Sequence, residues 1–120
     1  MNIILAGMPA SGKTTVSKEL GKILGCKVVD TDALIVEKYG EINGIFQAFG
    51  EEYFRDKETE TVKEVCTLEN AVISLGGGCL LRQKNVELLK NSGKIIYLKT
   101  TLETLIERAK GDTSRPLLKL

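Results

Sequence analysis

Short runs of consecutive apolar residues alternate along this chain with longer segments in which apolar residues recur every three or four positions. The runs NIILA, VV, AVISL and KIIYL predict buried strands at residues 2–6, 28–29, 71–75 and 94–98. The periodic segments predict helices, which cover residues 13–24, 32–39, 43–49, 51–68 and 83–91 and a last helix that Thr101 caps. Strands that alternate with helices predict an α/β fold, in which helices cover both faces of a parallel sheet.

The spacing of the apolar residues also predicts which face of each helix points inward. In segment 13–24 the inward positions are Val16, Leu20, Ile23 and Leu24, at offsets of 0, 4, 7 and 8 along the helix. Three of the later helices, at 51–68, at 83–91 and after Thr101, are each expected to bury one apolar stripe. These stripes consist of Phe54, Val62, Val65 and Leu68, of Val86 and Leu89, and of Leu102, Leu105, Ile106 and Ala109.

Composition excludes several classes of function. The chain has 120 residues, the size of one domain, and a net charge of +1, so no strong field attracts it to nucleic acid or to a membrane surface. It contains no histidine, which excludes imidazole acid–base catalysis, Ser-His triads and histidine-ligated metals. Its cysteines, Cys26, Cys66 and Cys79, form no CxxC pair, so we expect reduced thiols in a cytoplasmic protein. No apolar segment approaches transmembrane length.

The first predicted strand leads into GMPASGKT at residues 7–14, which fits the phosphate-loop pattern GxxxxGK[ST] between a strand and a helix. Gly7 and Gly12 permit the backbone angles that turn amide groups toward phosphate oxygens. The helix that follows adds its N-terminal dipole, Lys13 can reach the β and γ phosphates, and the Thr14 hydroxyl can ligate Mg²⁺. The motif predicts nucleotide binding without setting the nucleotide. The alternative is a glycine-rich turn that carries Lys-Thr by chance.

Two aspartates follow the second predicted strand, in VVDTDALI. Parallel sheets bind ligands at the carboxyl ends of their strands, where Asp30 and Asp32 would lie, and in an extended segment both side chains would point the same way. One could hold the water shell of Mg²⁺ while the other accepts a proton from a hydroxyl nucleophile. The alternative is that Asp32 only caps the next helix, and the spacing leaves both open.

Spacing leaves two further features ambiguous. Arg55, in EEYFR, is either a solvated surface charge or a fork for a carboxylate or phosphate in the cleft. The three glycines of SLGGGCLL, at residues 76–78, directly follow a strand, and they indicate either a close approach of the backbone to a ligand or a tight turn. Ser74, on the same strand, occupies a place where P-loop enzymes often carry a Walker B residue, although no aspartate ends that strand.

Taken in order, these motifs resemble one family, the shikimate kinases. The resemblance rests on GMPASGKT, VVDTD, GEINGIFQAFGEEYFR, SLGGGCLL, KIIYL, Arg108 and the RPLL of residues 115–118, so it covers nearly the whole chain. It implies transfer of the γ-phosphate of ATP to the 3-hydroxyl of shikimate, on the pathway to aromatic amino acids, with Mg²⁺ as the metal. We expect a monomeric cytoplasmic enzyme without a nucleic acid or membrane partner.

The resemblance also implies roles for individual residues. Asp32 would be the base that holds the accepting hydroxyl, Asp30 the outer Mg²⁺ aspartate, Arg55 the partner of the shikimate carboxylate, and Arg108 the side chain that stacks on adenine. The catalytic residues would be Lys13, Asp32 and Arg115, the last of these from a lid. The ATP-binding residues would be Gly7, Ala10, Ser11, Gly12, Lys13, Thr14, Thr15, Arg108 and Arg115. The shikimate site would consist of Asp32, Arg55, Gly76, Gly77 and Gly78, and the metal ligands would be Thr14 and Asp30. Ala10 departs from the family's usual glycine at a position where the general motif tolerates any residue.

The family pattern continues for several dozen residues beyond RPLL. We therefore expect residues 1–120 to form a single P-loop kinase domain that is incomplete at its C-terminal end, with a lid that begins near residue 111. Its three-layer αβα arrangement would contain a sheet of four strands in the order 2-3-1-4, without the family's fifth strand. The strand at 94–98 would be an edge, and the chain is expected to bind phosphates but to turn over poorly. Two other hypotheses remain open, a small P-loop kinase for gluconate or a nucleotide and a P-loop remnant without catalysis.

Overall fold

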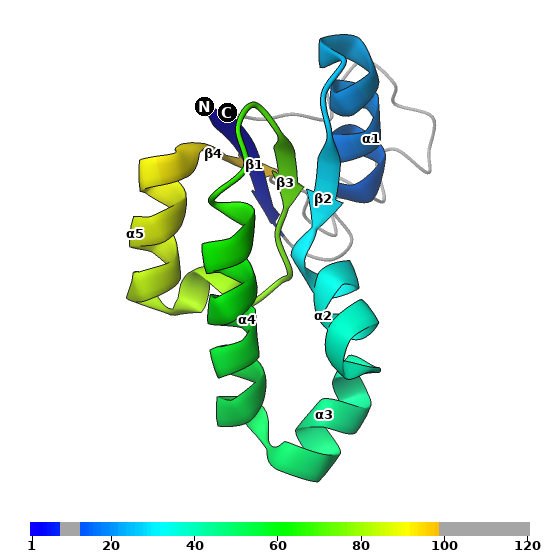
Figure 1. Cartoon of the computed structure of the whole chain (residues 1–120), viewed down its shortest axis with the longest axis vertical. Coiled ribbons are helices and arrows are strands. Elements are labelled where there is room, and N and C mark those ends of the chain that lie inside the picture. The colour runs from blue at the N-terminus through cyan, green and yellow to red at the C-terminus, as the bar shows by residue number, and fades with distance from the viewer. Residues whose placement is uncertain (8–12, 99–120) are drawn as a thin grey trace, which may run out of the picture.

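The computed structural model describes residues 1–7 and 13–98, which fold into four strands, five α-helices and one 3₁₀ turn (Figure 1). In chain order these elements are β1 (Asn2–Gly7), α1 (Lys13–Leu24), β2 (Val28–Asp30), α2 (Thr31–Tyr39), α3 (Ile42–Phe49), α4 (Glu51–Val65), β3 (Val72–Ser74), η2 (Cys79–Leu81), α5 (Gln83–Ser92) and β4 (Gly93–Leu98). Every element predicted within these residues is present, with ends that differ by at most three residues. The helix predicted from Thr101 lies outside the described residues.

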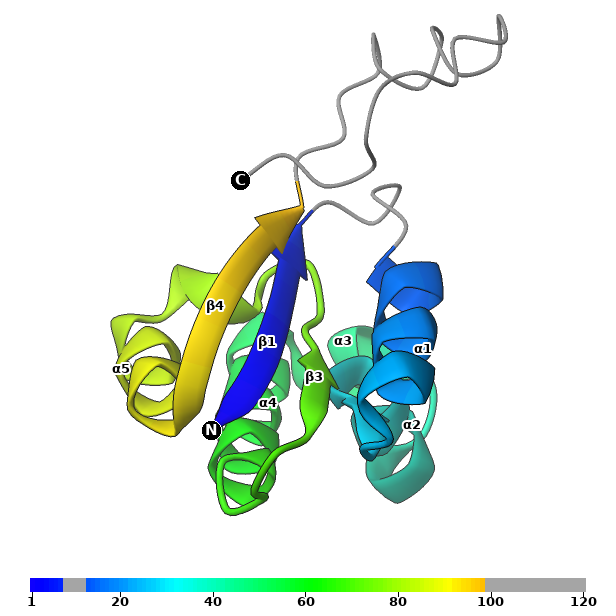
Figure 2. The ribbon, with the colours of Figure 1, turned by 90° about the horizontal axis from the view of Figure 1, so that it is seen from above.

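The four strands form one parallel sheet in the order β2-β3-β1-β4, which confirms the predicted fold class and strand order. β1 pairs with both β3 and β4, so Ile4 lies between Ile73 and Ile95. Helices α4 and α5 cover one face of the sheet and α1 covers the other (Figure 2). Because both faces are covered, the successive residues Ile4 and Leu5 are both fully buried. Within the described residues, β4 is an edge strand, as expected.

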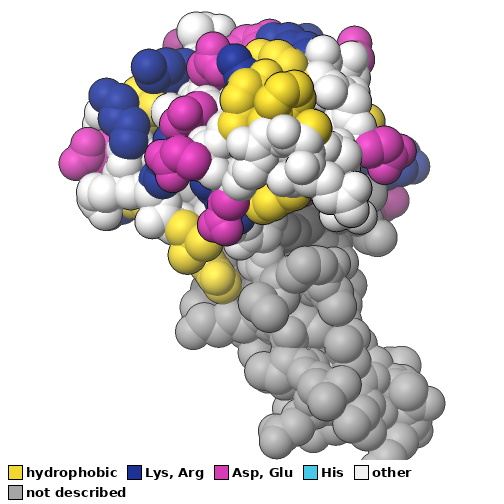
Figure 3. All heavy atoms as spheres, turned by 90° about the horizontal axis from the view of Figure 1, so that it is seen from below, with side chains coloured by type: hydrophobic (Ala, Val, Ile, Leu, Met, Phe, Trp, Pro, Cys, Tyr) yellow, Lys and Arg dark blue, Asp and Glu magenta, His cyan; other side chains and the backbone are white. Residues whose placement is uncertain are grey.

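One face of the molecule shows little separation of charge (Figure 3). Acidic, basic and apolar side chains are mixed on the face shown in Figure 3, in line with the net charge of +1. Lys38 and Glu64 form an ion pair that joins α2 to α4, but both side chains are about half exposed, so solvent screening keeps its contribution small. No helix in the two described segments is long and apolar enough to cross a membrane.

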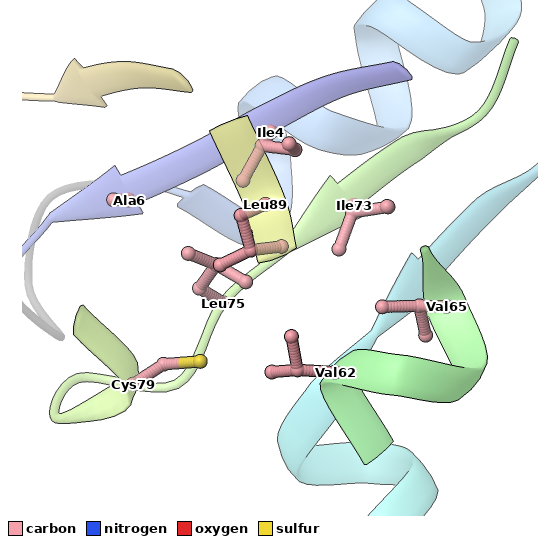
Figure 4. Packing of buried hydrophobic residues seen from close by; sticks show 8 residues of the cluster. All are labelled: Ile4, Ala6, Val62, Val65, Ile73, Leu75, Cys79 and Leu89. Carbon is pink, nitrogen blue, oxygen red and sulfur yellow. The ribbon is translucent and has the colours of Figure 1, made fainter. Parts of the chain in front are cut away.

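The main hydrophobic core lies between the sheet and helices α4 and α5 (Figure 4). It consists of Ile4, Ala6, Val62, Val65, Ile73, Leu75, Cys79 and Leu89. The inward face predicted for α4 is therefore confirmed, and Leu68, which lies beyond the end of α4, is half-buried against the same core. On α5, Leu89 is buried as predicted, whereas Val86 is only partly buried and the second buried residue is Asn85. Burial raises the pKa of the Cys79 thiol, so this side chain stays neutral and packs as an apolar group.

A second, smaller hydrophobic cluster lies among α2, α3 and α4, the helices at the lower end of Figure 1. Ile35, Ile45 and Phe54 supply one buried side chain from each helix. The ring of Phe46 packs on that of Phe54 with 4.9 Å between the centroids. Helix α4 spans both clusters, because Phe54 belongs to the smaller one while Val62 belongs to the main core.

The prediction that Ile23 and Leu24 point inward is wrong, since these residues are 76% and 52% exposed. Helix α1 instead approaches the sheet through two small residues one turn apart, Ser17 and Gly21, which are both buried. A Cβ added at Gly21 would lie only 2.2 Å from Val28 Cγ2, so the helix lies too close to β2 for a larger side chain. This close approach turns the two apolar residues at the end of α1 outward.

Replacing Leu89 with alanine should lower the free energy of unfolding by about 2–5 kcal/mol, the usual cost of a cavity in a close-packed core. Leu89 is fully buried, whereas Leu81, the matched control, is 79% exposed. Leu81→Ala should therefore change stability by no more than about 0.5 kcal/mol. Urea unfolding of both variants measures the difference, and equal losses would contradict the core described above.

Candidate active site

The carboxyl ends of three neighbouring strands meet at one edge of the parallel sheet, and each carries a residue that the sequence singles out. Gly7 ends β1, Asp30 ends β2 and Ser74 ends β3. The register places Ser74 between Leu5 of β1 and Asp30 of β2. Because parallel sheets bind ligands at this edge, strand pairing brings the start of the phosphate loop and the first aspartate to the same place.

The phosphate loop joins β1 to α1. Gly7 has a φ of 147°, a backbone conformation that favours glycine. Helix α1 begins at Lys13, so the amide groups of its first turn and the positive end of its dipole follow the loop directly. Thr14 and Thr15 continue that first turn. The remaining loop residues predicted to bind ATP lie outside the described residues, and they are Ala10, Ser11 and Gly12.

Helix α2 is capped by Asp30. Its Oδ1 accepts a 3.0 Å hydrogen bond from the Ala33 amide, and the helix begins at Thr31. The alternative that Asp32 only caps this helix is therefore wrong, and so is the prediction that both aspartates lie in one extended segment. The physical reason is that aspartate is favoured directly before the first helical residue, where it satisfies a free amide. Asp32 consequently lies in the first turn of α2.

The Asp32 carboxylate lies against the backbone of Gly76. A Cβ added at Gly76 would come within 2.3 Å of Asp32 Oδ1, closer than real side-chain atoms approach. The Gly76 amide donates a 3.0 Å hydrogen bond to the hydroxyl of Thr31, which is buried, and this bond fixes the turn against the start of α2. A side chain at Gly76 would therefore force the Asp32 carboxylate to move.

Arg55 lies against Gly78, two residues further along the same turn. A Cβ added at Gly78 would be 2.6 Å from Arg55 Nη1 and 2.7 Å from Nη2. Arg55 Nη1 donates a 2.9 Å hydrogen bond to Glu58 Oε1, and the two side chains are only 18% and 1% exposed. The interpretation of Arg55 as a solvated surface charge is therefore wrong. The glycines do more than form a tight turn, because they let a carboxylate and a guanidinium, from Asp32 and Arg55, pack on one short stretch of backbone.

Glu58 is a buried acidic residue that the sequence reasoning missed. Burial raises the pKa of its carboxyl, while the hydrogen bond and charge of Arg55 act in the opposite direction. The guanidinium therefore supports an ion that the protein interior disfavours, and the ion in turn holds the guanidinium in place. The available signal is the spacing of three residues on one helix, which puts Arg55 and Glu58 on the same face.

Comparisons with known proteins match this geometry to one family. The family model for shikimate kinase matches residues 9–120. A shikimate kinase from Clostridium botulinum (strain 657 / Type Ba4) is 48% identical over 121 residues, which cover 98% of this chain and 71% of that protein. A shikimate kinase from Caldicellulosiruptor bescii is 43% identical over 119 residues, which cover 98% of this chain and 69% of that protein. The chain belongs to the shikimate kinase family.

Solved structures of shikimate kinases share the fold described above. The enzyme from Aquifex aeolicus superposes with a TM-score of 0.81 at 37% identity, over 99% of this chain and 71% of that one. The enzyme from Acinetobacter baumannii, solved in complex with shikimate, gives 0.83 at 38% identity, over 99% of this chain and 67% of that one. A gluconokinase from Sinorhizobium meliloti gives 0.62 at only 18% identity, so it shares the fold alone. Shikimate kinases are ATP-dependent phosphotransferases, and the alternative of a chance glycine-rich turn is therefore wrong.

Ser74 stands out in this shikimate kinase as a buried polar residue. Its hydroxyl is the one buried side-chain nitrogen or oxygen that has no hydrogen-bond partner among the described residues. Buried hydroxyls are normally paired, and this one lies at the ligand edge of the sheet in register with Asp30. The position therefore suits a polar ligand, as the comparison with Walker B residues suggests.

Two predicted arginines of the shikimate kinase site, Arg108 and Arg115, lie outside the described residues, and their roles remain predictions.

Sequence reasoning also missed a polar contact set that joins α4 to the start of α5. It is formed by Thr59, Arg82 and Asn85. Nothing in the local spacing of these residues indicates that they meet, since they are brought together only by the packing of two helices.

The raised pKa of Glu58 predicts how stability depends on pH. Because the folded chain holds the Glu58 proton more tightly than the unfolded chain does, this carboxyl makes the folded state more stable as the pH falls through its raised pKa. Glu58→Gln lacks this dependence. The unfolding free energy of the wild type minus that of the variant should therefore rise as the pH falls from about 7 toward the ordinary glutamate pKa. The total rise should be about 1.4 kcal/mol for each unit by which folding raises the pKa of Glu58. Urea unfolding of both chains measures it, and a constant difference would contradict the assignment.

Replacing Gly78 with alanine should displace the Arg55 guanidinium. Gly78 has a φ of −104°, so alanine strains no backbone there, and the cost arises from the contact with Arg55. We expect a loss of about 1–3 kcal/mol in unfolding free energy, the value of a charged hydrogen bond to a buried group. The loss should shrink when Arg55 is already alanine, which a double-mutant cycle measures.

Gly44→Ala is the matched control for Gly78→Ala. A Cβ added at Gly44 meets nothing within 4 Å. Helix propensity alone then predicts a gain of about 1 kcal/mol. Equal losses for Gly78→Ala with and without Arg55 would show that the guanidinium is not the obstacle.

Proposed function

We propose that this chain transfers the γ-phosphate of ATP to the 3-hydroxyl of shikimate. One arrangement carries the proposal: Asp32 and Arg55 lie against Gly76 and Gly78 of one turn, at the ligand edge of the sheet. Shikimate presents a carboxylate and hydroxyl groups, so a fixed cation and a fixed anion beside each other complement it. The similar enzyme from Acinetobacter baumannii, which was solved in complex with shikimate, supports the choice of acceptor.

Asp32 acts as the base in this proposal. The 3-hydroxyl oxygen forms a bond to the γ-phosphorus while the bond from this phosphorus to the β–γ bridging oxygen breaks. ADP leaves, and the hydroxyl proton passes to the Asp32 carboxylate. Phosphoryl transfer depends mainly on positioning and charge stabilisation, and the packing of Asp32 on Gly76 supplies a fixed position.

Arg55 binds the carboxylate of shikimate. A guanidinium has five N–H donors in a planar fork, and the hydrogen bond from Nη1 to Glu58 occupies one of them. The side chain is only 18% exposed, so its pairing with a carboxylate is weakly screened. Gly77, between the two packed glycines, is exposed and lets the substrate approach the backbone, together with Gly76 and Gly78.

The phosphate side of the site belongs to the junction of β1 and α1. The phosphates of ATP lie against Gly7, Lys13 and the N-terminus of α1, where free amides and the helix dipole favour anions. The rest of the proposed ATP site consists of Ala10, Ser11, Gly12, Thr14, Thr15, Arg108 and Arg115. In this set Lys13 and Arg115 are the catalytic cations, and Arg108 stacks on adenine.

Mg²⁺ fits the residues at this edge. Asp30 uses one carboxylate oxygen to cap α2, which leaves the other for a water of the ion's shell. The buried Ser74 hydroxyl lies in register with it and lacks a partner among the described residues. Mg²⁺ keeps several waters and takes one or two protein ligands. Thr14 and Asp30 would hold the ion, which when bound neutralises charge on the phosphates.

We further propose that residues 1–120 form one domain and that the enzyme works as a cytoplasmic monomer on a small molecule. The net charge of +1 and the mixed charges in Figure 3 give no support for a nucleic acid or membrane partner. The single four-stranded sheet supports one domain in the described part.

Shikimate-dependent release of ADP, followed by a coupled assay, tests the function. Asp32→Asn should lower kcat by about 10²–10⁴-fold, because the variant keeps the shape of the side chain but cannot accept the proton. Arg55→Lys should instead raise the KM for shikimate, by about 10-fold or more, since lysine cannot replace a two-pronged contact. The KM for ATP should stay within about twofold of the wild-type value in both variants, because neither side chain contacts the phosphates in this proposal. A wild-type chain that releases no ADP with shikimate, or an Asp32→Asn chain with the wild-type rate, would overturn it.

A further inference from the structure

A chain of buried polar contacts joins α4 to the turn that carries the three glycines. Asn85, in the first turn of α5, is fully buried. Its Nδ2 donates a 2.8 Å hydrogen bond to the carbonyl oxygen of Cys79, the residue directly after Gly78. Its Oδ1 accepts a 2.8 Å hydrogen bond from the hydroxyl of Thr59 on α4. Asn85 therefore connects the end of the glycine turn to the substrate helix.

The same contacts return to Arg55. Thr59 lies one helical turn after Arg55, and its hydroxyl is 3.1 Å from the Arg55 carbonyl oxygen. The hydroxyl has one proton, and the shorter contact, to Asn85, is its hydrogen bond, so Thr59 is joined to Arg55 mainly through this turn of α4. The Arg55 guanidinium in turn packs against Gly78. The set therefore forms a closed ring that runs from Arg55 through Thr59, Asn85 and Cys79 to Gly78 and back.

A contribution to the free energy of folding does not readily explain this ring of polar contacts. A buried amide costs free energy unless all its polar atoms are paired, and an apolar side chain of similar size packs without that cost. A paired amide, however, fixes direction and distance, which apolar contacts do not. Asn85 pairs both ends of its amide, so it fixes how α4 lies relative to the glycine turn.

Arg82 closes the exposed end of the ring. Its Nη2 donates to Glu52 at 2.9 Å, and its Nη1 donates to Asp56 at 3.0 Å and to the Thr59 hydroxyl at 3.3 Å. Because Glu52 and Asp56 are exposed, these ion pairs contribute little free energy on their own. Their effect is to restrict Arg82, which covers Thr59 from the outside.

We propose that Thr59 and Asn85 are positioning residues for the kinase reaction. They set the place of the Arg55 guanidinium relative to Gly78 and, through it, the orientation of the substrate carboxylate. The proposal deepens the function given above and rests on it for the identity of the substrate. Neither residue contacts the substrate, so both act only through Arg55.

Thr59→Val tests the proposal, because valine keeps the shape of threonine and removes the hydroxyl. The KM for shikimate should rise about tenfold, as expected when a binding group is slightly misplaced, while kcat and the KM for ATP stay within about twofold. Thr59→Ser, which keeps the hydroxyl and loses the methyl group, should restore the wild-type KM. If Thr59 has a purely structural role, both variants should be less stable than the wild type, and the KM for shikimate should not change. Thr59→Ala, which favours the helix, gives the same loss of the hydroxyl and should reproduce the result of Thr59→Val.

A second readout needs no turnover. The Nε–Hε cross-peak of Arg55 in a ¹H–¹⁵N spectrum is assigned by its loss in Arg55→Lys. It should shift or broaden in Thr59→Val and stay in place in Thr59→Ser. An unchanged peak in Thr59→Val overturns the positioning role, whatever the activity. If the peak responds as expected in Thr59→Val and Thr59→Ser while the wild-type chain does not phosphorylate shikimate, only the proposed function is contradicted.

Discussion

The turn that follows β3 can hold two charged side chains against its backbone because the residues at the two points of contact have no Cβ atom. Asp32 arrives from α2 and packs on Gly76, and Arg55 arrives from α4 and packs on Gly78. A methyl group at either position would occupy the space of an ionised group. The turn is nevertheless well fixed, because Thr31 accepts a hydrogen bond from its first amide and Asn85 donates one to the carbonyl just beyond it. Two different helices thus place their charges on one short segment that lies later in the chain.

The charges around this turn are maintained against the tendency of the interior to exclude them. Burial alone would favour the protonated form of Glu58, and Arg55 is the main group that opposes this effect. An apolar pair in the same place would pack at least as well. The ion pair is therefore better explained by the orientation of Arg55 than by stability, and the same reasoning applies to the paired amide of Asn85. The main core, by contrast, is built from apolar residues of the sheet, α4 and α5.

The elements of this fold could be predicted because their signals are local. A strand covered on both faces needs consecutive apolar residues, and the phosphate loop needs its glycines and its Lys-Thr within eight positions. The outward turn of Ile23 and Leu24 could not be predicted, because it results from the contact between Gly21 and Val28 on another element. The strand order came from the family resemblance, since spacing alone does not determine which strands pair.

The candidate site likewise has a part that could be predicted from the sequence and a part that could not. The glycine turn, Asp32 and Arg55 carry recognisable motifs, but their mutual contacts depend on tertiary packing. Spacing left the role of Asp32 open because an aspartate at the predicted start of a helix can also be its cap, and the structure resolves this by starting α2 at Thr31 with Asp30 as the cap. Glu58 was missed because a glutamate three residues after an arginine is common on exposed helices. Its burial, together with the 2.9 Å hydrogen bond from Arg55, shows that it holds this guanidinium.

Helix α4 connects the two halves of the site. Its first turns belong to the small cluster with α2 and α3, through Phe54, and its last turns belong to the main core, through Val62 and Val65. Arg55 and Glu58 lie between these two regions, while the phosphate loop belongs to the sheet. Several polar contacts join α4 to its neighbours, among them the pairs of Arg82 with Glu52 and Asp56. The Lys38–Glu64 pair is exposed and screened, whereas the Thr59–Asn85 contact is largely buried and directional. The buried Thr59–Asn85 hydrogen bond therefore adds a fixed direction and distance between α4 and α5 to the hydrophobic contacts that hold α4 against the sheet.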